Sequence, residues 1–138
     1  MIAEAFVRVR YGETDRMGVA YYANYFVWFE VARTALFASI GLPYRVLEES
    51  YDCVLPVVEA SCRYRRYVRY DDELEIECWL SRVARRGVTF GYRILKDGGL
   101  VAEGFTKHVV VDKRGKTKSF PQSVYNILKK VEYGGHKT

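Results

Sequence analysis

One carboxylate ahead of a long apolar stretch is the feature of this sequence best suited to chemistry. Asp15 stands in a short segment with Gly18, and an apolar stretch follows from Tyr22 to Ile40. If that stretch is a helix, its first backbone N–H groups lack intrahelical partners and carry partial positive charge. These groups can receive the oxygen of a polarised carbonyl, while a carboxylate opposite them attacks the carbonyl or activates water. The alternative is that Asp15 only caps the helix or completes a turn, as most aspartates before helices do.

Signatures of other catalytic chemistries are missing from the sequence. There is no G-x-S-x-G elbow and no phosphate-binding glycine loop of either common type. His108 lies among valines in a predicted strand, where we interpret it as structural, and His136 is near the end. The cysteines are odd in number and form no C-x-x-C pair, which disfavours a zinc site or a disulfide framework and fits a reducing cytosol. We therefore expect neither a metal nor a separate cofactor.

Length and composition describe one ordinary globular domain over residues 1–138. The chain is 49% hydrophobic and 28% charged, with a net charge of +5. That moderate excess is compatible with a partner bearing phosphates and does not require one. The N-terminus lacks the apolar core of a signal peptide, and the longest uncharged stretch, residues 17–29, is too short to span a bilayer. We expect a cytoplasmic protein with no membrane insertion.

The apolar pattern predicts one long helix and two short ones. Residues 22–40 are apolar in almost every direction around a helical turn, which is typical of a buried helix. Gly41 and Pro43 form a stop signal. A short helix or turn is expected over residues 43–51, and a terminal helix over residues 121–131 before a loose tail at residues 134–138.

Alternation with a period of two predicts five strands. They cover residues 5–11, 54–67, 73–85, 88–95 and 100–111. Strands joined by tight turns pair antiparallel, and Asp97-Gly98-Gly99 is a strong hairpin signal. The expected architecture is α+β, a five-stranded antiparallel sheet wrapped around one long central helix, with a short C-terminal helix.

The same pattern predicts self-association. A helix that is apolar on all sides presents more apolar surface than one sheet covers, so the remainder must meet another surface. Trp79 is expected to point outward, and aromatic residues are enriched at interfaces. We expect a homodimer or a homotetramer.

Residues 8–25, followed by F-E-x-A-R at residues 29–33, resemble the 4-hydroxybenzoyl-CoA thioesterase family of hotdog-fold proteins. The similarity rests on T-D-x-x-G-V-x-Y and the A-N-Y after it, and it continues in residues 67–74. It is closest to the YbgC/FadM-like acyl-CoA thioesterases. The resemblance implies a hotdog fold and the hydrolysis of an acyl-CoA thioester to free acid and coenzyme A.

The resemblance also assigns roles to residues of the loop and the helix start. Asp15 would be the catalytic nucleophile or general base, and the backbone N–H of Tyr22 would polarise the thioester carbonyl. Many members of the branch carry histidine where this chain has Tyr22, so a role for an imidazole is lost. The remaining residues would shape the loop, hold it or line the acyl pocket: Gly18, Val19, Asn24 and Tyr25.

The coenzyme A phosphates would need cationic partners. Our first choice is the turn formed by Arg85, Arg86 and Gly87, because its backbone amides can join the arginines at a phosphate. Two other basic groups offer alternatives, at residues 113–118 and at residues 63–66.

Three other functions compete with the thioesterase. A non-catalytic protein that binds acyl-CoA or an acyl carrier would share the fold. A hydratase of this fold would need a histidine a few residues after Asp15, where the chain has Ala20 and Tyr22. An RNA-binding module is suggested faintly by residues 86–93, but Val88 and Arg93 stand where that motif needs aromatic residues.

Overall fold

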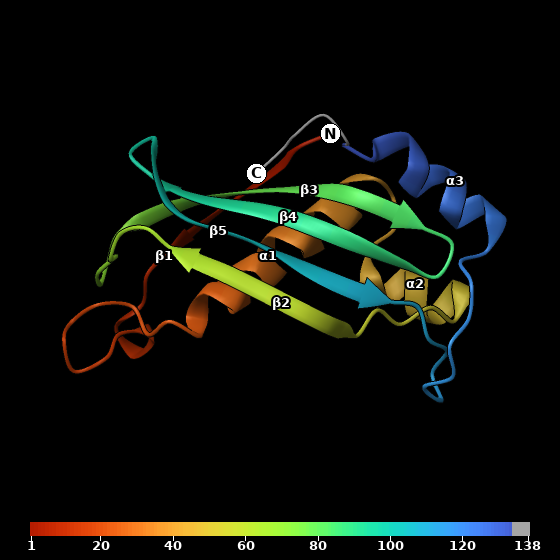
Figure 1. Cartoon of the computed structure of the whole chain (residues 1–138), viewed down its shortest axis with the longest axis horizontal. Helices are drawn as coiled ribbons and strands as arrows, with labels where there is room; N and C mark the ends of the chain where they lie inside the picture. Colours follow the sequence, from red (N-terminus) through yellow and green to blue (C-terminus); the bar gives the residue numbers. More distant parts are fainter. Residues whose placement is uncertain (134–138) are drawn as a thin grey trace.

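The computed structural model describes residues 1–133, in which strands and helices follow the predicted order. Figure 1 shows the long helix lying across one face of a curved sheet. The elements are β1 (Ala3–Arg8), a 3₁₀ turn (Tyr11–Glu13), α1 (Asn24–Ser39), α2 (Tyr44–Tyr51), β2 (Val57–Tyr64), β3 (Glu73–Ala84), β4 (Gly87–Lys96), β5 (Gly99–Val109) and α3 (Gln122–Val131). The predicted tail at residues 134–138 lies outside the described residues.

The five strands form one antiparallel sheet in the order β1-β3-β4-β5-β2. The predicted hairpin between β4 and β5 is confirmed, because Asp97 and Gly98 both have positive φ, at 50° and 77°. Two successive residues of that kind match the right-handed twist of paired strands. The predicted α+β architecture, a five-stranded sheet around one long helix with a short C-terminal helix, is therefore confirmed.

The strand ends differ from the prediction by up to three residues, and two of these shifts have local causes. β1 ends at Arg8, opposite Glu73, because the chain then turns into the 3₁₀ segment. β2 begins at Val57 although pairing starts earlier, where Val54 and Val111 exchange two backbone hydrogen bonds. Pro56 has no N–H to donate, so the ladder is interrupted there.

Helix α1 is buried on one face only, which corrects the prediction of burial all round. The buried residues recur at helical spacing: Tyr25, Trp28, Phe29, Ala32, Leu36 and Phe37. On the other face, Val27 and Val31 are 47% and 40% exposed. The helix also starts at Asn24, two residues after the predicted Tyr22. The expected excess of apolar surface therefore exists, as an open stripe along α1.

The core between α1 and the sheet is built from aromatic rings. Phe29 stacks on Tyr92 of β4 with ring centroids 4.1 Å apart, and Phe37 packs on Phe90 at 5.3 Å. The cysteines are free thiols, and Cys53 and Cys78 are buried, as small hydrophobic residues are.

Trp79 does not present the exposed aromatic surface that was expected of it. Its ring lies against Gly91, its partner residue on β4, and only 1% of Trp79 is exposed. A Cβ at Gly91 would lie 2.4 Å from the Trp79 ring, so the missing side chain makes room for it. The Arg93 guanidinium lies 5.6 Å from the centre of the same ring. Trp79 is therefore no argument for self-association.

None of the helices in residues 1–133 is, taken singly, both long and apolar enough to cross a membrane; α1 and α2 meet that test only as a pair bent by 62°.

Gly104 on β5 should be essential to the packing of β2 and α1. A Cβ there would lie 2.1 Å from the Ser61 carbonyl oxygen and 3.0 Å from the Phe29 ring. We expect Gly104→Ala to lower the free energy of unfolding by roughly 1–3 kcal/mol. The matched control is Gly12→Ala, because a Cβ at Gly12 meets nothing within 4 Å. Urea unfolding of both variants checks this, and equal stabilities would contradict it.

Candidate active site

The loop that carries Asp15 is closed by its own backbone. The Asp15 N–H donates to the Val19 carbonyl at 2.9 Å, and the Gly18 N–H donates to the Asp15 carbonyl at 3.0 Å. Gly18 has a φ of 79°, a conformation that costs glycine little. Val19 is buried, and the Ala20 N–H donates to the Val68 carbonyl at 2.8 Å. Gly18 thus allows the loop to turn, and Val19 and Ala20 hold it against the segment before β3.

The Asp15 carboxylate is exposed and does not cap α1. Its Oδ1 accepts the Met17 N–H at 2.8 Å, and within residues 1–133 its other oxygen accepts no hydrogen bond. The N-cap position of α1 is Ala23, which supplies no side-chain cap. The turn-forming interpretation of Asp15 accounts for one oxygen, and the second oxygen remains available for chemistry.

A buried carboxylate that the sequence analysis did not single out joins this loop to the helix. Glu13 is only 6% exposed, and its carboxylate accepts the Arg10 N–H at 2.8 Å and the Trp28 indole N–H at 3.2 Å. Its backbone carbonyl accepts the Tyr21 N–H and the Asn24 side-chain amide, both at 2.8 Å. No periodicity marks Glu13; only its place two residues before Asp15 could have suggested a role.

The backbone N–H groups just before α1 are free within the described chain. Asn24 N donates to the Tyr21 carbonyl at 3.0 Å, and the Tyr64 hydroxyl donates to the Tyr22 carbonyl at 3.0 Å. The N–H groups of Tyr22 and Ala23 donate to no acceptor in residues 1–133. Tyr22 precedes the helix, so its amide belongs to the turn that leads into α1.

Asn24 and Tyr25, the residues expected to hold the loop or line the pocket, are the first two residues of α1. The Asn24 side chain holds the Glu13 carbonyl. Tyr25 is buried, with Tyr64 edge-on at 4.7 Å and Trp28 at 4.9 Å, and burial raises its pKa to about 12. In a single chain Asn24 holds the loop, and Tyr25 packs among aromatic rings.

The structure separates the two arginines of the predicted phosphate site. The Arg85 guanidinium donates to the Gln122 side chain at 2.8 Å and lies 4.6 Å from the centre of the Tyr125 ring, so α3 engages it. Arg86 instead lines a surface depression of about 360 Å³ together with Arg82 and Lys107.

Gly87 serves the sheet, since a Cβ there would lie 2.4 Å from the His108 carbonyl oxygen. The alternative basic groups are partly engaged as well. Arg65 pairs with Glu103 at 2.6 Å, and Lys118 donates to the Tyr51 carbonyl at 2.9 Å. The depression that contains Arg86 is thus a better candidate for an anion than the Arg85–Arg86 turn as a unit.

His108 belongs to a buried chain of hydrogen bonds with one consistent direction. Its Nδ1 lies 2.9 Å from the Leu55 carbonyl, which only accepts, so Nδ1 carries the proton. Nε2 then accepts the Thr106 hydroxyl at 2.8 Å, and the Thr106 oxygen accepts the Tyr92 hydroxyl at 2.6 Å. His108 is fully committed to the core, which confirms the structural interpretation.

The structure argues against the RNA-binding alternative. Val88, Phe90 and Tyr92 of β4 are all buried in the core and cannot stack on bases.

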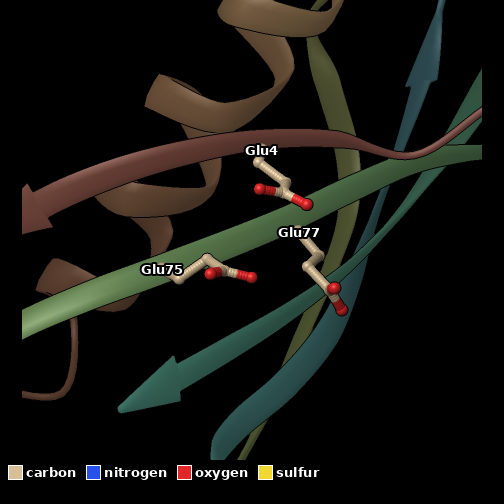
Figure 2. A group of neighbouring side chains, drawn as sticks. All are labelled: Glu4, Glu75 and Glu77. Carbon is tan, nitrogen blue, oxygen red and sulfur yellow. The ribbon is translucent and has the colours of Figure 1, made fainter. Parts of the chain in front are cut away.

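Three carboxylates gather on β1 and β3, away from the loop. Figure 2 shows Glu4, Glu75 and Glu77 side by side, and their oxygens lie within 4.8 Å of one another. Partial burial, then the charges of Glu4 and Glu77, raise the pKa of Glu75. Glu77 forms an ion pair with Arg93 at 2.7 Å, and Glu4 is exposed. We assign the group no catalytic role.

His108 should make stability depend on pH. Burial lowers its pKa to about 4 from 6.5. Between those values the unfolded chain binds a proton that the folded chain does not, so the free energy of unfolding falls as pH falls from 6.5 to 4. The maximum loss is about 3 kcal/mol. Urea unfolding between pH 7 and 4.5 measures this dependence. The free energy of unfolding should fall less steeply with decreasing pH for His108→Gln than for the parent, and an equal dependence on pH would contradict this.

Comparison with known proteins identifies relatives over nearly the whole chain. The family model described as the thioesterase-like superfamily matches residues 9–128. The acyl-CoA thioesterase YbgC of Haemophilus influenzae is 31% identical over 120 residues, which are 86% of this chain and 88% of that protein.

Solved structures agree with this match. A hypothetical protein from Thermus thermophilus has a TM-score of 0.90 at 32% identity and covers 96% of this chain and 99% of its own. A DHNA-CoA thioesterase from Staphylococcus aureus has a TM-score of 0.89 at 26% identity and covers 94% of this chain and 90% of its own. The likeness confirms the hotdog fold.

Proposed function

The chain belongs to the thioesterase-like superfamily, and from this we propose that it is an acyl-CoA thioesterase, which hydrolyses an acyl-CoA thioester to free acid and coenzyme A. The observation that carries the proposal is the pairing of groups in residues 15–23. The Asp15 carboxylate has a free oxygen, and the Tyr22 N–H, seven residues along the chain, has no acceptor in residues 1–133. The carboxylate can attack a carbonyl carbon or activate water against it, and the N–H can donate a hydrogen bond to the carbonyl oxygen.

The proposed reaction places the thioester carbonyl between these two groups. Its oxygen takes the Tyr22 N–H, which stabilises the negative charge that develops there. Asp15 either attacks the carbonyl carbon, giving a mixed anhydride that water cleaves, or removes a proton from water as water attacks. In both routes the C–S bond breaks, and the thiolate of coenzyme A takes up a proton.

The active form is proposed to be a homodimer or homotetramer. Asp15 is exposed in a single chain, so a second copy would have to enclose the reacting carbonyl. The α1 stripe with Val27 and Val31 is open, and so are Val57 and Val58 at the edge strand β2. Unpaired strand edges and apolar stripes of this kind are covered by partners in stable proteins.

Replacement of Asp15 tests the chemistry. Asp15→Asn keeps the side-chain shape and its bond to Met17 but removes the charge, so we expect kcat to fall by roughly 100-fold or more. Because Asp15 is exposed, the melting temperature should barely move. Release of coenzyme A from a panel of acyl-CoAs, followed with a thiol reagent, measures the effect.

Asp97→Asn is the matched control, since Asp97 lies in the β4–β5 turn. A variant at Asp15 that hydrolyses as fast as the parent would exclude this residue from the reaction. A parent that binds acyl-CoA and releases no coenzyme A would favour the non-catalytic binding protein.

The Arg86 depression is proposed to hold the coenzyme A phosphates, with Arg82 and Lys107 beside it. We expect Arg86→Ala to raise KM for acyl-CoA roughly tenfold, the effect of about one lost bond to a charge, with kcat retained. The same acyl group on pantetheine, which lacks the nucleotide phosphates, should show no change. Arg114→Ala in the exposed 112–116 turn is the control, and an equal change of KM for both substrates would refute the assignment.

A further inference from the structure

Tyr64 connects the end of β2 to the turn that precedes α1. Its hydroxyl donates to the Tyr22 carbonyl at 3.0 Å, across 42 positions of sequence. Its ring meets Tyr25 edge-on at 4.7 Å and Tyr22 at 6.5 Å. Tyr64 is 44% exposed, and these two ring contacts and the hydrogen bond of its hydroxyl hold it against the turn.

The two peptides of this turn are held at their carbonyl ends. The Tyr21 carbonyl accepts the Asn24 N–H, and this bond orients the peptide that carries the Tyr22 N–H. The Tyr22 carbonyl accepts the Tyr64 hydroxyl, with only a long 3.4 Å contact from Tyr25 N besides. That carbonyl belongs to the peptide that carries the Ala23 N–H. In the described chain both N–H groups lack acceptors, so each peptide is held at its carbonyl while its N–H remains unbonded.

We propose that Tyr64 is a positioning residue for the oxyanion-binding amides. It sets the orientation of the Tyr22–Ala23 peptide and makes the Ala23 N–H a second donor beside that of Tyr22. A hydroxyl that donates to a peptide carbonyl polarises the peptide and strengthens the hydrogen bond its N–H can give. Donors held in place before the reaction need no reorganisation as charge develops. This inference rests on the proposed thioesterase function.

The surroundings of Tyr64 keep its hydroxyl a donor. Burial, followed by the nearby Cys62 thiol, raises its pKa, so the hydroxyl stays protonated wherever the enzyme is assayed. A phenylalanine at this position would keep the ring contacts and lose only the donor.

The test compares Tyr64→Phe with Tyr51→Phe. Tyr51 lies on α2, and its hydroxyl has no hydrogen bond within residues 1–133. For Tyr64→Phe we expect kcat to fall roughly tenfold, about the effect of one neutral hydrogen bond. KM should be unchanged, and the loss should be the same for short, long and aromatic acyl-CoAs. For Tyr51→Phe we expect no change. A loss that varies with the acyl group, or that appears only in KM, would make Tyr64 a substrate contact and overturn the inference.

A measurement without substrate separates this inference from the proposed function. In ¹⁵N–¹H spectra, the Ala23 amide resonance should move in Tyr64→Phe and should stay in place in Tyr51→Phe. An unmoved Ala23 resonance would overturn the positioning role. If Ala23 moves but the parent hydrolyses no acyl-CoA, the proposed function fails, and the control of this peptide by Tyr64 stands.

Discussion

The arrangement of the candidate site depends on one buried carboxylate, that of Glu13. It accepts hydrogen bonds from the Arg10 backbone and the Trp28 indole, while its carbonyl accepts from Tyr21 and Asn24. A hydrogen bond to a charged group contributes about 1.5–3 kcal/mol, and a buried charge left unpaired costs more. Because these partners come from the residue before the 3₁₀ turn, the turn before α1 and α1 itself, Glu13 ties the Asp15 loop to the helix start.

Because Glu13 anchors the loop, polar groups of the neighbouring residues can remain without hydrogen-bond partners. A loop without it would be free to let the Tyr22 and Ala23 amides bond elsewhere or the Asp15 carboxylate cap the helix. Instead the loop is closed by its own backbone and held from below by Val19 and Ala20. One Asp15 oxygen and the Tyr22 and Ala23 N–H groups then keep no hydrogen-bond partner within residues 1–133. Tyr64 extends the same support from the far edge of the sheet.

The sequence was sufficient for the fold because its patterns are local. Period-two alternation and the Asp97-Gly98 turn predicted the sheet, and Pro56 and the 3₁₀ turn account for two of the shifted strand ends. The apolar residues of α1 misled for a physical reason. One sheet covers only the face with Trp28 and Phe29, and composition alone does not distinguish a helix buried in one chain from one completed by a partner.

The site was less accessible to sequence reasoning, because its contacts join distant segments. Asp15 and Tyr22 were proposed from the motif and from helix electrostatics. Glu13 and Tyr64 were missed, since nothing in the spacing of positions 13 and 28, or 22 and 64, signals a contact. Adjacent residues can also have different partners: Arg85 contacts α3, whereas Arg86 lines the surface depression.

The most direct test of the account is a crystal structure of the Asp15→Asn variant with an unhydrolysed acyl-CoA. We expect the thioester oxygen within hydrogen-bonding distance, roughly 3 Å, of the Tyr22 and Ala23 amides, with the side chain of residue 15 facing the carbonyl carbon. An acyl-CoA whose thioester lies away from this turn, for instance on the outer face of the sheet, would contradict the account.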